Sequence, residues 1–356
     1  MAVSPSSYSD SESFAAALHD LANRLPDLKH GKYIQRALTV LMRLTGEEVD
    51  RLDWKILSAA MQDLEGGFQV FYPYRHIRKV SVFGSARTPV DKPIYRMAVD
   101  FSRRMTEQGF MVITGAGEGI MAAGNEGAGR ENSFGLNINL PFEQGSNRYI
   151  EDDPKLVQFK YFFTRKLFFL RESDAIALFP GGFGTLDEAF ESLTLSQTGK
   201  YGPAPIVFID NPGGDYWQSL DRHIRDHLIT NGLVSPNDPS IYTITDDLDQ
   251  ACAAISNFYR VYHSSRYVNH LFVMRLNSEL SDETVEQLNE EYGDLLVKGR
   301  IEKSAALPAE QGDETVNLPR LVFEFNQKSA ARLGQMIRQI NELGALLPES
   351  DHPERK

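Results

Sequence analysis

Apolar residues in the middle of the chain come in short runs that are separated by longer amphipathic stretches. The runs that we expect to form strands are Val80–Phe83, Phe110–Thr114, Ser133–Leu140, Ala175–Phe179, Pro205–Ile209 and Ile241–Ile244. Short apolar runs that alternate with helical segments are typical of a parallel sheet with crossover helices. The pattern therefore predicts an α/β fold, a doubly wound parallel sheet with helices on both faces, over residues 76–264.

The segments on either side have different patterns. Residues 1–13 are rich in serine and acidic residues, and we expect them to be disordered because they have little to bury. Residues 14–75 carry leucines at spacings of three and four, which predicts a helical extension. Residues 265–356 are expected to form a small α+β module. Its expected elements are strands at Leu271–Leu276 and Leu321–Phe325, helices at Ser281–Leu296 and Ser329–Leu343, and a polar loop at Ala305–Asn317.

Three of the predicted strands end in turns that contain glycine, namely Gly84-Ser85, Gly115–Gly119 and Pro180–Gly184. The carboxyl ends of parallel strands share one edge of a sheet, so the three turns should converge on one crevice. Glycine lets a phosphate approach the free N–H groups at a helix start. Such turns also serve merely to join a strand to a helix, and the Gly-Lys-Ser/Thr of a Walker loop is absent.

Glu188 follows the third glycine turn and has two interpretations. In Thr185-Leu-Asp-Glu188 it fits the Glu of a capping box, which bonds back to the start of its helix. As a catalytic group, it would be kept ionised by its place in the first helical turn. An ionised carboxylate suits cleavage of an N-glycosidic bond, because positive charge develops on the ribose and a water must be oriented.

The segment Phe159–Leu170 is amphipathic, rich in aromatic residues, and carries Arg165 and Lys166 in its middle. The two cations belong either to a solvated face or to a functional site. In the functional interpretation, Arg165 contacts the phosphate or ribose of a ligand or pairs with Glu188, because a guanidinium suits bidentate contact with oxyanions.

Composition argues against several other classes of protein. A net charge of -12 repels a nucleic-acid backbone, and the lysines and arginines form no basic stripe. No stretch is apolar for long enough to cross a bilayer, so we expect no membrane partner and a cytoplasmic location. The single cysteine, Cys252, and Trp217 are expected to be packing residues. His223 and His227 lack a third ligand, so we expect a helical surface and no metal site.

The run Pro180-Gly-Gly-Phe-Gly-Thr-Leu-Asp-Glu188, with Phe163-Thr-Arg165-Lys166 before it, resembles the signature of the Lonely Guy (LOG) family. That signature is PGGxGTxxE, preceded by a helix with an Arg-Lys pair, and the whole run matches it. The similarity covers about Val80 to Ala254. It implies a Rossmann-like fold and hydrolysis of nucleoside 5'-monophosphates, of AMP or cytokinin riboside type, to free base and ribose 5-phosphate.

The resemblance also implies which residues act. Arg165 and Glu188 would be the catalytic pair, and the substrate-binding residues would be Gly84, Ser85, Gly115, Gly117, Gly119, Lys166, Gly181, Gly182, Gly184 and Thr185. No cofactor or metal is implied, and family members assemble as dimers or larger homo-oligomers. The chain departs from the short members at Phe162-Phe163, where they have Met-His, and at Ala116, where they have a third glycine. It also has both terminal extensions.

Two other functions stay open beside hydrolysis. Related folds bind a nucleotide or cofactor without hydrolysing it, although the presence of both Arg165 and Glu188 favours an enzyme. A pyridoxal-phosphate decarboxylase rests only on an old label of the family, and no lysine has the context of a Schiff base. The terminal extensions are expected to regulate the enzyme or to build the oligomer.

Overall fold

The computed structural model of the protein describes residues 16, 20, 24–25, 28–138 and 145–344. The chain divides into two compact units, Met1–Gln62 and Asp63–Lys356. The first contains α2 (Gly31–Thr45) and the beginning of α3 (Arg51–Phe71), which confirms helices in the N-terminal extension. The expected disorder of residues 1–13 lies outside the described residues.

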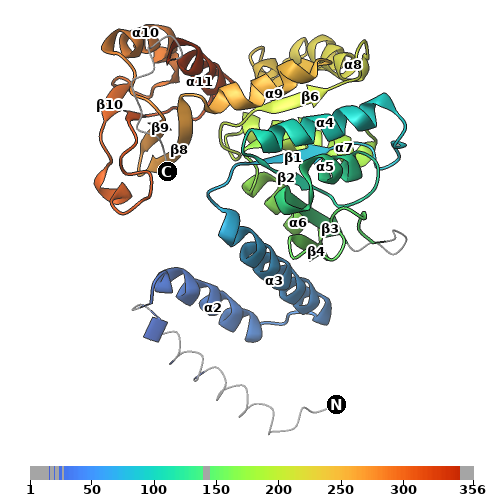
Figure 1. Ribbon diagram of the computed structural model, residues 1–356. Helices are drawn as coiled ribbons and strands as arrows, with labels where there is room; N and C mark the ends of the chain where they lie inside the picture. Colours follow the sequence, from blue (N-terminus) through green and yellow to red (C-terminus); the bar gives the residue numbers. More distant parts are fainter. Residues whose placement is uncertain (1–15, 17–19, 21–23, 26–27, 139–144, 345–356) are drawn as a thin grey trace, which may run out of the picture. The chain divides into compact units, whose positions relative to one another are not determined.

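The second unit is built on a parallel sheet, in which the described residues form seven strands in the order β4-β3-β2-β1-β5-β6-β7 (Figure 1). The strands are β1 (Lys79–Phe83), β2 (Met111–Thr114), β3 (Ser133–Ile138), β4 (Leu156–Phe159), β5 (Ala175–Leu178), β6 (Ile206–Ile209) and β7 (Tyr242–Thr245). The chain builds the sheet outward from β1 to β4 and then returns to place β5 on the other side of β1. This confirms the doubly wound fold, with the reversal of strand order between β1 and β5.

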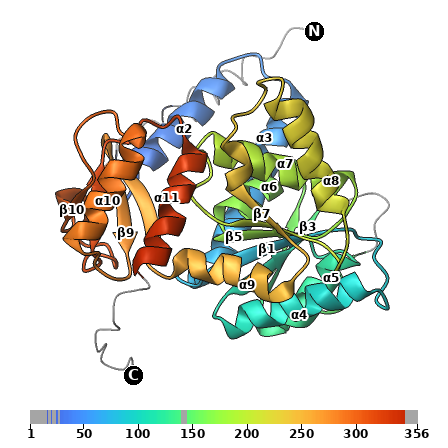
Figure 2. The same ribbon diagram turned by 90° about the horizontal axis from the view of Figure 1, so that it is seen from above.

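Helices cover both faces of the sheet, as expected. They are α4 (Pro93–Glu107), α5 (Ile120–Ala128), α6 (Phe162–Arg171), α7 (Phe183–Gln197), α8 (Tyr216–His223) and α9 (Leu248–Ser256). One face packs on α4, α5 and α9, and the other on α6, α7, α8 and the end of α3 (Figure 2). Successive residues of a strand point to opposite faces, so Val80 and Val82 enter the first core and Phe83 enters the second.

The strand β4 was missed in the sequence. Its residues, Leu156–Phe159, include a glutamine and alternate between exposed and buried positions at the edge of the sheet. The interior strands are buried at every position and therefore read as continuous apolar runs. An edge strand lacks that signature because one side of it has no neighbouring strand.

The last part of the chain forms an antiparallel sheet of order β10-β11-β9-β8, packed on two helices. Its elements are β8 (Tyr262–Val268), β9 (Leu271–Leu276), α10 (Asp282–Tyr292), β10 (Glu302–Ser304), β11 (Arg320–Phe323) and α11 (Ala330–Leu343). The α+β module is thus confirmed, and Ser281 caps α10 by accepting the N–H of Thr284 at 3.1 Å. The polar strands β8 and β10 were missed, because their residues lack an apolar run.

The polar loop of this module is held down by a buried ion cluster. The fully buried carboxylate of Glu310 accepts hydrogen bonds from Arg275 at 2.6 Å and from Arg320 at 3.0 Å, and both arginines lie on strands of the small sheet. A buried carboxylate needs such charged donors, because burial without them is strongly unfavourable. The loop between β10 and β11 is therefore anchored at Glu310.

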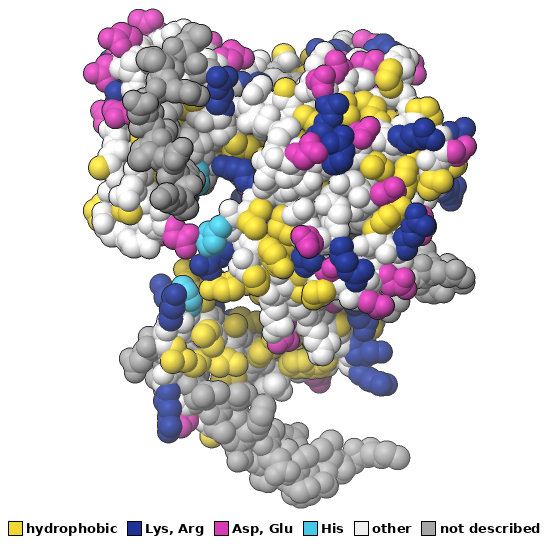
Figure 3. All heavy atoms as spheres, in the orientation of Figure 1, with side chains coloured by type: hydrophobic (Ala, Val, Ile, Leu, Met, Phe, Trp, Pro, Cys, Tyr) yellow, Lys and Arg dark blue, Asp and Glu magenta, His cyan; other side chains and the backbone are white. Residues whose placement is uncertain are grey.

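Acidic and basic side chains are interspersed on the face shown in Figure 3, without a broad basic area. Among the described residues, no helix is both long enough and apolar enough to span a bilayer.

Candidate active site

The glycine turns converge at the carboxyl edge of the sheet, where β1 and β5 lie side by side. The Ser85 N–H donates to the Pro180 carbonyl at 3.1 Å, which joins the turn after β1 to the turn after β5. The Ser85 carbonyl accepts the N–H of Ile120 at 3.0 Å, which joins the first turn to the start of α5. The turns therefore meet at the point where the strand order reverses, which is where open α/β sheets bind ligands.

Several of the predicted glycines are required by the fold itself. A Cβ at Gly181 would lie 2.1 Å from the hydroxyl of Thr185, which is buried beside it. A Cβ at Gly84 would lie 2.6 Å from the side chain of Ile120. Gly119 has a φ of +64°, and a Cβ there would lie 2.2 Å from the carbonyl of Ser85. These glycines let the turns approach one another.

Gly182 and Gly184 are different, because a Cβ at either position would meet no atom within 4 Å. Gly182 is the N-cap of α7, and Gly184 is the second residue of that helix. The first N–H groups of a helix are not used within it and are available to an anion. The open space at these two glycines lies at such a helix start.

The turn after β2 is held by a buried polar network that the sequence did not reveal. Asn125 accepts hydrogen bonds from Thr114 at 2.8 Å and from Asn147 at 3.0 Å. Asn147 also donates to the carbonyl of Gly117 at 3.0 Å. Ala116 takes a left-handed φ of 61°, which a glycine adopts at less cost.

Arg165 on α6 lies against this same turn. Its Nε donates to the Leu136 carbonyl in β3 at 2.7 Å, and its guanidinium carbon lies 5.2 Å from the centre of the Phe169 ring. A Cβ on Gly115 would lie 2.4 Å from its Nη2. Gly115 thus makes room for the guanidinium of Arg165, which places this cation beside the turn after β2.

The beginning of α6 is fixed by Asp63, another residue that the sequence did not single out. The buried carboxylate of Asp63 accepts the N–H groups of Lys160 and Tyr161 at 3.1 Å and the hydroxyl of Thr164 at 2.6 Å. A carboxylate is favoured at a helix start by the free N–H groups and the dipole. Asp63 therefore orients the helix that carries Arg165.

Lys166 lies among three carboxylates of α7. Its ammonium is 2.6 Å from Glu191, 2.9 Å from Asp187 and 3.9 Å from Glu188. These carboxylates raise the pKa of Lys166, although burial acts in the opposite direction. Glu191 lies three residues after Glu188 and four after Asp187, which indicates that the carboxylates share one face of α7, but the sequence does not show that Lys166 faces them.

Glu188 is not a capping residue, so that interpretation was wrong. Helix α7 begins at Phe183 with Gly182 as its N-cap and no side-chain cap, which puts Glu188 beyond the first turn. Only 14% of the Glu188 side chain is exposed, and burial raises its pKa to about 7 although Lys166 and Arg165 lower it. Glu188 thus lies outside the first helical turn, where the dipole was expected to favour its ionised form, and burial disfavours that form.

The solvated-face interpretation of the cations was wrong as well. Lys166 is only 16% exposed, and Arg165 is half-buried. Before its last residue, Arg171, the exposed positions of α6 are instead Phe162, Phe163 and Leu167, of which Phe163 is 57% exposed. Helix α6 thus directs its cations toward the glycine turns and α7, and it leaves aromatic and aliphatic side chains at the surface.

Four other residues that the sequence singled out lie outside the glycine turns. His223 and His227 are exposed, and no cluster of three metal-ligating side chains exists among the described residues. Trp217 is buried, stacks on Phe208 at 4.5 Å and donates to the Ile209 carbonyl. Cys252 is buried in the core under α9.

Comparison with known proteins gives three kinds of similarity. A family model described as "possible lysine decarboxylase" matches residues 116–255. A cytokinin riboside 5'-monophosphate phosphoribohydrolase of Rhodococcoides fascians is 33% identical over 91 residues, which are 26% of this chain and 44% of that protein. The protein of the same name in Mycobacterium tuberculosis is 25% identical over 173 residues, which are 48% of this chain and 89% of its own length.

Among solved structures, the molybdenum cofactor binding protein of Rippkaea orientalis is 17% identical, with a TM-score of 0.34 over 49% of this chain and 91% of that chain. The chain thus spans less than half of the length of the Rhodococcoides protein that it matches and most of the Mycobacterium protein. The match to the family model, residues 116–255, includes the PGGxGTxxE run. Through that segment, the chain is similar to LOG-type phosphoribohydrolases, at low sequence identity.

Proposed function

We propose that the protein hydrolyses the N-glycosidic bond of nucleoside 5'-monophosphates and releases a free base and ribose 5-phosphate. The observation that carries this proposal is the buried Glu188 carboxyl, with a pKa of about 7, beside the glycine turns at the reversal of strand order. The names of the relatives in Rhodococcoides and Mycobacterium, which are phosphoribohydrolases, support it.

The roles follow from charge and position. The open N–H groups at Gly182 and Gly184, together with Thr185, would hold the 5'-phosphate at the start of α7. Arg165 would add a cation for the phosphate or ribose from the side of β3. Glu188, as carboxylate, would stabilise the positive charge that develops on the ribose and orient the attacking water.

Lys166 is better described as a positioning residue than as a direct ligand. Its ammonium is already engaged by Asp187 and Glu191, at 2.9 Å and 2.6 Å. It lowers the pKa of Glu188 against the effect of burial. We therefore propose that Lys166 keeps Glu188 ionised near neutral pH, while the phosphate is bound by the turns.

The direct test is incubation of the purified protein with a panel of nucleoside 5'-monophosphates, including AMP and the isopentenyladenosine form. Free base is detected by chromatography, and the matching nucleosides without phosphate serve as controls. We expect release from at least one nucleotide and little from its nucleoside, because phosphate binding contributes to the transition state. Tight binding without release from any nucleotide would instead support a carrier of nucleotides or cofactors.

The pH profile of kcat/KM should have an ascending limb near pH 7. Burial raises the pKa of Glu188 above its usual value to about 7, so its ionised form is present above that pH and is lost as the pH falls through it. Initial rates between pH 5 and 9, corrected for the phosphate of the substrate, which titrates near pH 6, measure this limb. A rate that stays constant from pH 5.5 to 8 after correction contradicts the role of Glu188 as a carboxylate.

Gly184→Ala should change stability and activity in opposite directions. The added methyl meets no atom within 4 Å, and alanine in a helix is favoured over glycine by about 0.5–1 kcal/mol. We therefore expect a slightly higher unfolding temperature together with a KM raised by about tenfold, since the methyl obstructs the phosphate. Gly66→Ala in α3, where a Cβ also has room, is the control and should leave KM unchanged.

Assembly and location remain predictions. Four apolar side chains near the site are largely exposed, namely Phe163, Leu167, Phe183 and Phe190 on α6 and α7. Contact with a second copy would bury them, which supports the homo-oligomer that the family resemblance implies. Light scattering of the purified protein measures the number of copies. A cytoplasmic location and a substrate of AMP or cytokinin type are proposed on the sequence and the relatives alone.

A further inference from the structure

A cavity of about 240 Å³ lies between the parallel sheet and the C-terminal module, away from the glycine turns. Its apolar wall is formed by Pro205 and by buried side chains of both parts: Ile206, Phe258, Phe272, Phe325 and Leu333. Its volume lies just below the range of roughly 300–1,000 Å³ that is typical of sites for small molecules. The cavity therefore has room for a compact ligand with an apolar body.

The charged groups of this wall are all positive. Two arginines line the cavity, Arg266 and Arg338, and no Asp or Glu does. Arg266 is paired with Asp313 at 2.8 Å. Arg338 on α11 makes no hydrogen bond and no salt bridge with any residue that the structure describes, although it is half-buried and burial lowers its pKa. Glu342, four residues further along α11, attracts this guanidinium but does not form an ion pair with it, so no carboxylate of the described residues is bound directly to Arg338 at the cavity.

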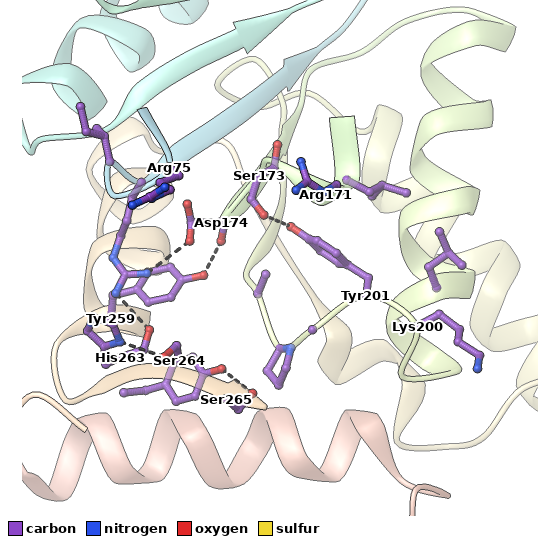
Figure 4. A pocket seen from close by; sticks show the side chains of 18 of the residues that line it. Arg75, Arg171, Ser173, Asp174, Lys200, Tyr201, Tyr259, His263, Ser264 and Ser265 are labelled. Atoms are coloured by element: carbon purple, nitrogen blue, oxygen red, sulfur yellow. Dashed lines mark hydrogen bonds and ion pairs between the residues drawn. The ribbon is translucent and has the colours of Figure 1, made fainter. Parts of the chain in front are cut away.

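A second, larger cavity of about 1120 Å³ shares the Tyr201–Ala204 loop as a wall and shows the contrast (Figure 4). Its arginines already have acidic partners: Arg75 pairs with Glu314 at 3.5 Å, and Arg78 pairs with Asp174 at 3.4 Å. Tyr259 donates to the Asp174 carbonyl beside them. These two arginines of the larger cavity thus each have a carboxylate within ion-pair distance, whereas Arg338 of the smaller cavity does not.

A polar atom near the apolar wall also lacks a partner. The hydroxyl of Ser196, at the end of α7, is buried without a hydrogen bond to any described residue. A buried hydroxyl without a partner is unfavourable, and a rotation about its Cα–Cβ bond changes the direction in which it points. A ligand with an oxygen acceptor would satisfy both this hydroxyl and the guanidinium.

We propose that this cavity binds a small amphiphilic monocarboxylate, whose carboxylate pairs with Arg338 and whose apolar body fills the space between the sheet and the module. A guanidinium suits the planar carboxylate in a bidentate arrangement. One unpaired cation matches one negative charge, whereas a phosphate dianion would leave an excess charge in the apolar cavity. The ligand would contact both parts of the second unit and would therefore stabilise their junction.

The proposal is tested on the full chain by isothermal titration calorimetry with octanoate and 3-phenylpropionate. The neutral counterparts, 1-octanol and 3-phenylpropionamide, report on the apolar cavity alone. We expect one molecule of acid to bind per chain and the neutral compounds to bind about tenfold more weakly or worse, since a hydrogen bond to a charged group is worth at least that factor. The proposal is overturned if acid and neutral compound bind equally well. It is also overturned if neither acid binds at 10 mM, since such a site should have a Kd of roughly 10 mM or lower.

Two variants remove the charge and the space separately. Arg338→Gln leaves the helix intact and should lower the affinity for the acids by about tenfold or more. Gly334→Leu keeps Arg338 but fills the cavity. A Cβ at residue 334 would have only the Nη1 of Arg338 within 4 Å, at 3.8 Å. This variant should therefore abolish binding of the acids without lowering the unfolding temperature. Arg332→Gln, on the same helix but paired with Asp294, is the control.

The glycine turns are the other site at which a carboxylate could bind. Arg165→Lys should leave the affinity for octanoate unchanged, and a saturating nucleoside 5'-monophosphate should not compete with it. A loss of octanoate binding in Arg165→Lys, or unchanged binding in Arg338→Gln, would move the acid to the candidate active site and refute the assignment to this cavity.

Discussion

Glu188→Gln is expected to lower kcat for base release by about 10²- to 10³-fold, with KM changed only a few-fold. The glutamine keeps the shape of the side chain but carries no negative charge to stabilise the developing cation, and loss of one preorganised electrostatic group typically has that magnitude. Steady-state rates on the best nucleotide of the panel measure the effect. Activity within tenfold of the parent would remove Glu188 from the catalytic pair.

The same substitution should stabilise the fold at pH 8. The folded-state pKa of Glu188, about 7 against an ordinary 4.5, means that the folded state holds a proton more tightly than the unfolded state. The resulting destabilisation is absent below pH 4.5, grows as the pH rises toward 7 and is complete above it. Glutamine avoids it, so we expect a gain on the order of 1–3 kcal/mol at pH 8, before any loss of attraction to Lys166.

Thermal unfolding at pH 8 and at pH 5 separates this effect from a general change in packing. The gain in Glu188→Gln should shrink at pH 5, where the parent is already largely protonated. Glu107→Gln, an exposed residue on α4 that is 59% accessible, is the matched control and should show no such gain. A variant that is less stable than the parent at both pH values would contradict the raised pKa.

Arg165→Lys is expected to lower kcat/KM by about 100-fold. The guanidinium of Arg165 donates through Nε to Leu136 and lies beside Gly115, so it reaches from β3 to the turn after β2. A lysine keeps the charge but not the planar set of donors that serves both places. Loss of bidentate contact with an oxyanion typically costs more than one tenfold step in affinity.

The substrate without phosphate tells which group Arg165 serves. If Arg165 binds the phosphate, Arg165→Lys should lower kcat/KM for the nucleoside only slightly. The nucleoside has no phosphate, so neither the parent nor the variant makes that contact with it. Arg171→Lys, at the exposed end of the same helix and paired with Glu172, is the control and should retain the parent's kcat/KM. An equal loss in Arg171→Lys would indicate that α6 as a whole has been disturbed.

The interior strands and the glycine turns could be predicted from the sequence because they depend on local composition. A strand that is buried on both faces, such as β1 or β5, must be apolar at nearly every position. A turn that lets two loops approach, as at Gly181 beside Thr185, must contain glycine. The strands β4, β8 and β10 were not predicted, because a strand at a sheet edge or with a polar face lacks a continuous apolar run.

The start of α7 shows where local reasoning fails. Thr185 and Glu188 have the spacing of a capping box, and yet the helix begins two residues before Thr185. The Thr185 side chain is buried against Gly181, so packing with the turn takes the place of capping. The motif has the right residues, but contacts with a preceding segment decide what they do.

By itself, the sequence determined the doubly wound sheet, the convergence of three glycine turns and the LOG signature, since strand burial and turn geometry restrict which residues each position accepts. Only the tertiary structure decided the pKa of Glu188, the three carboxylates around Lys166, the support of α6 by Asp63 and the lack of a partner for Arg338. These properties depend on desolvation and on charges brought from distant segments, and neither is encoded in the residues next to them in the chain.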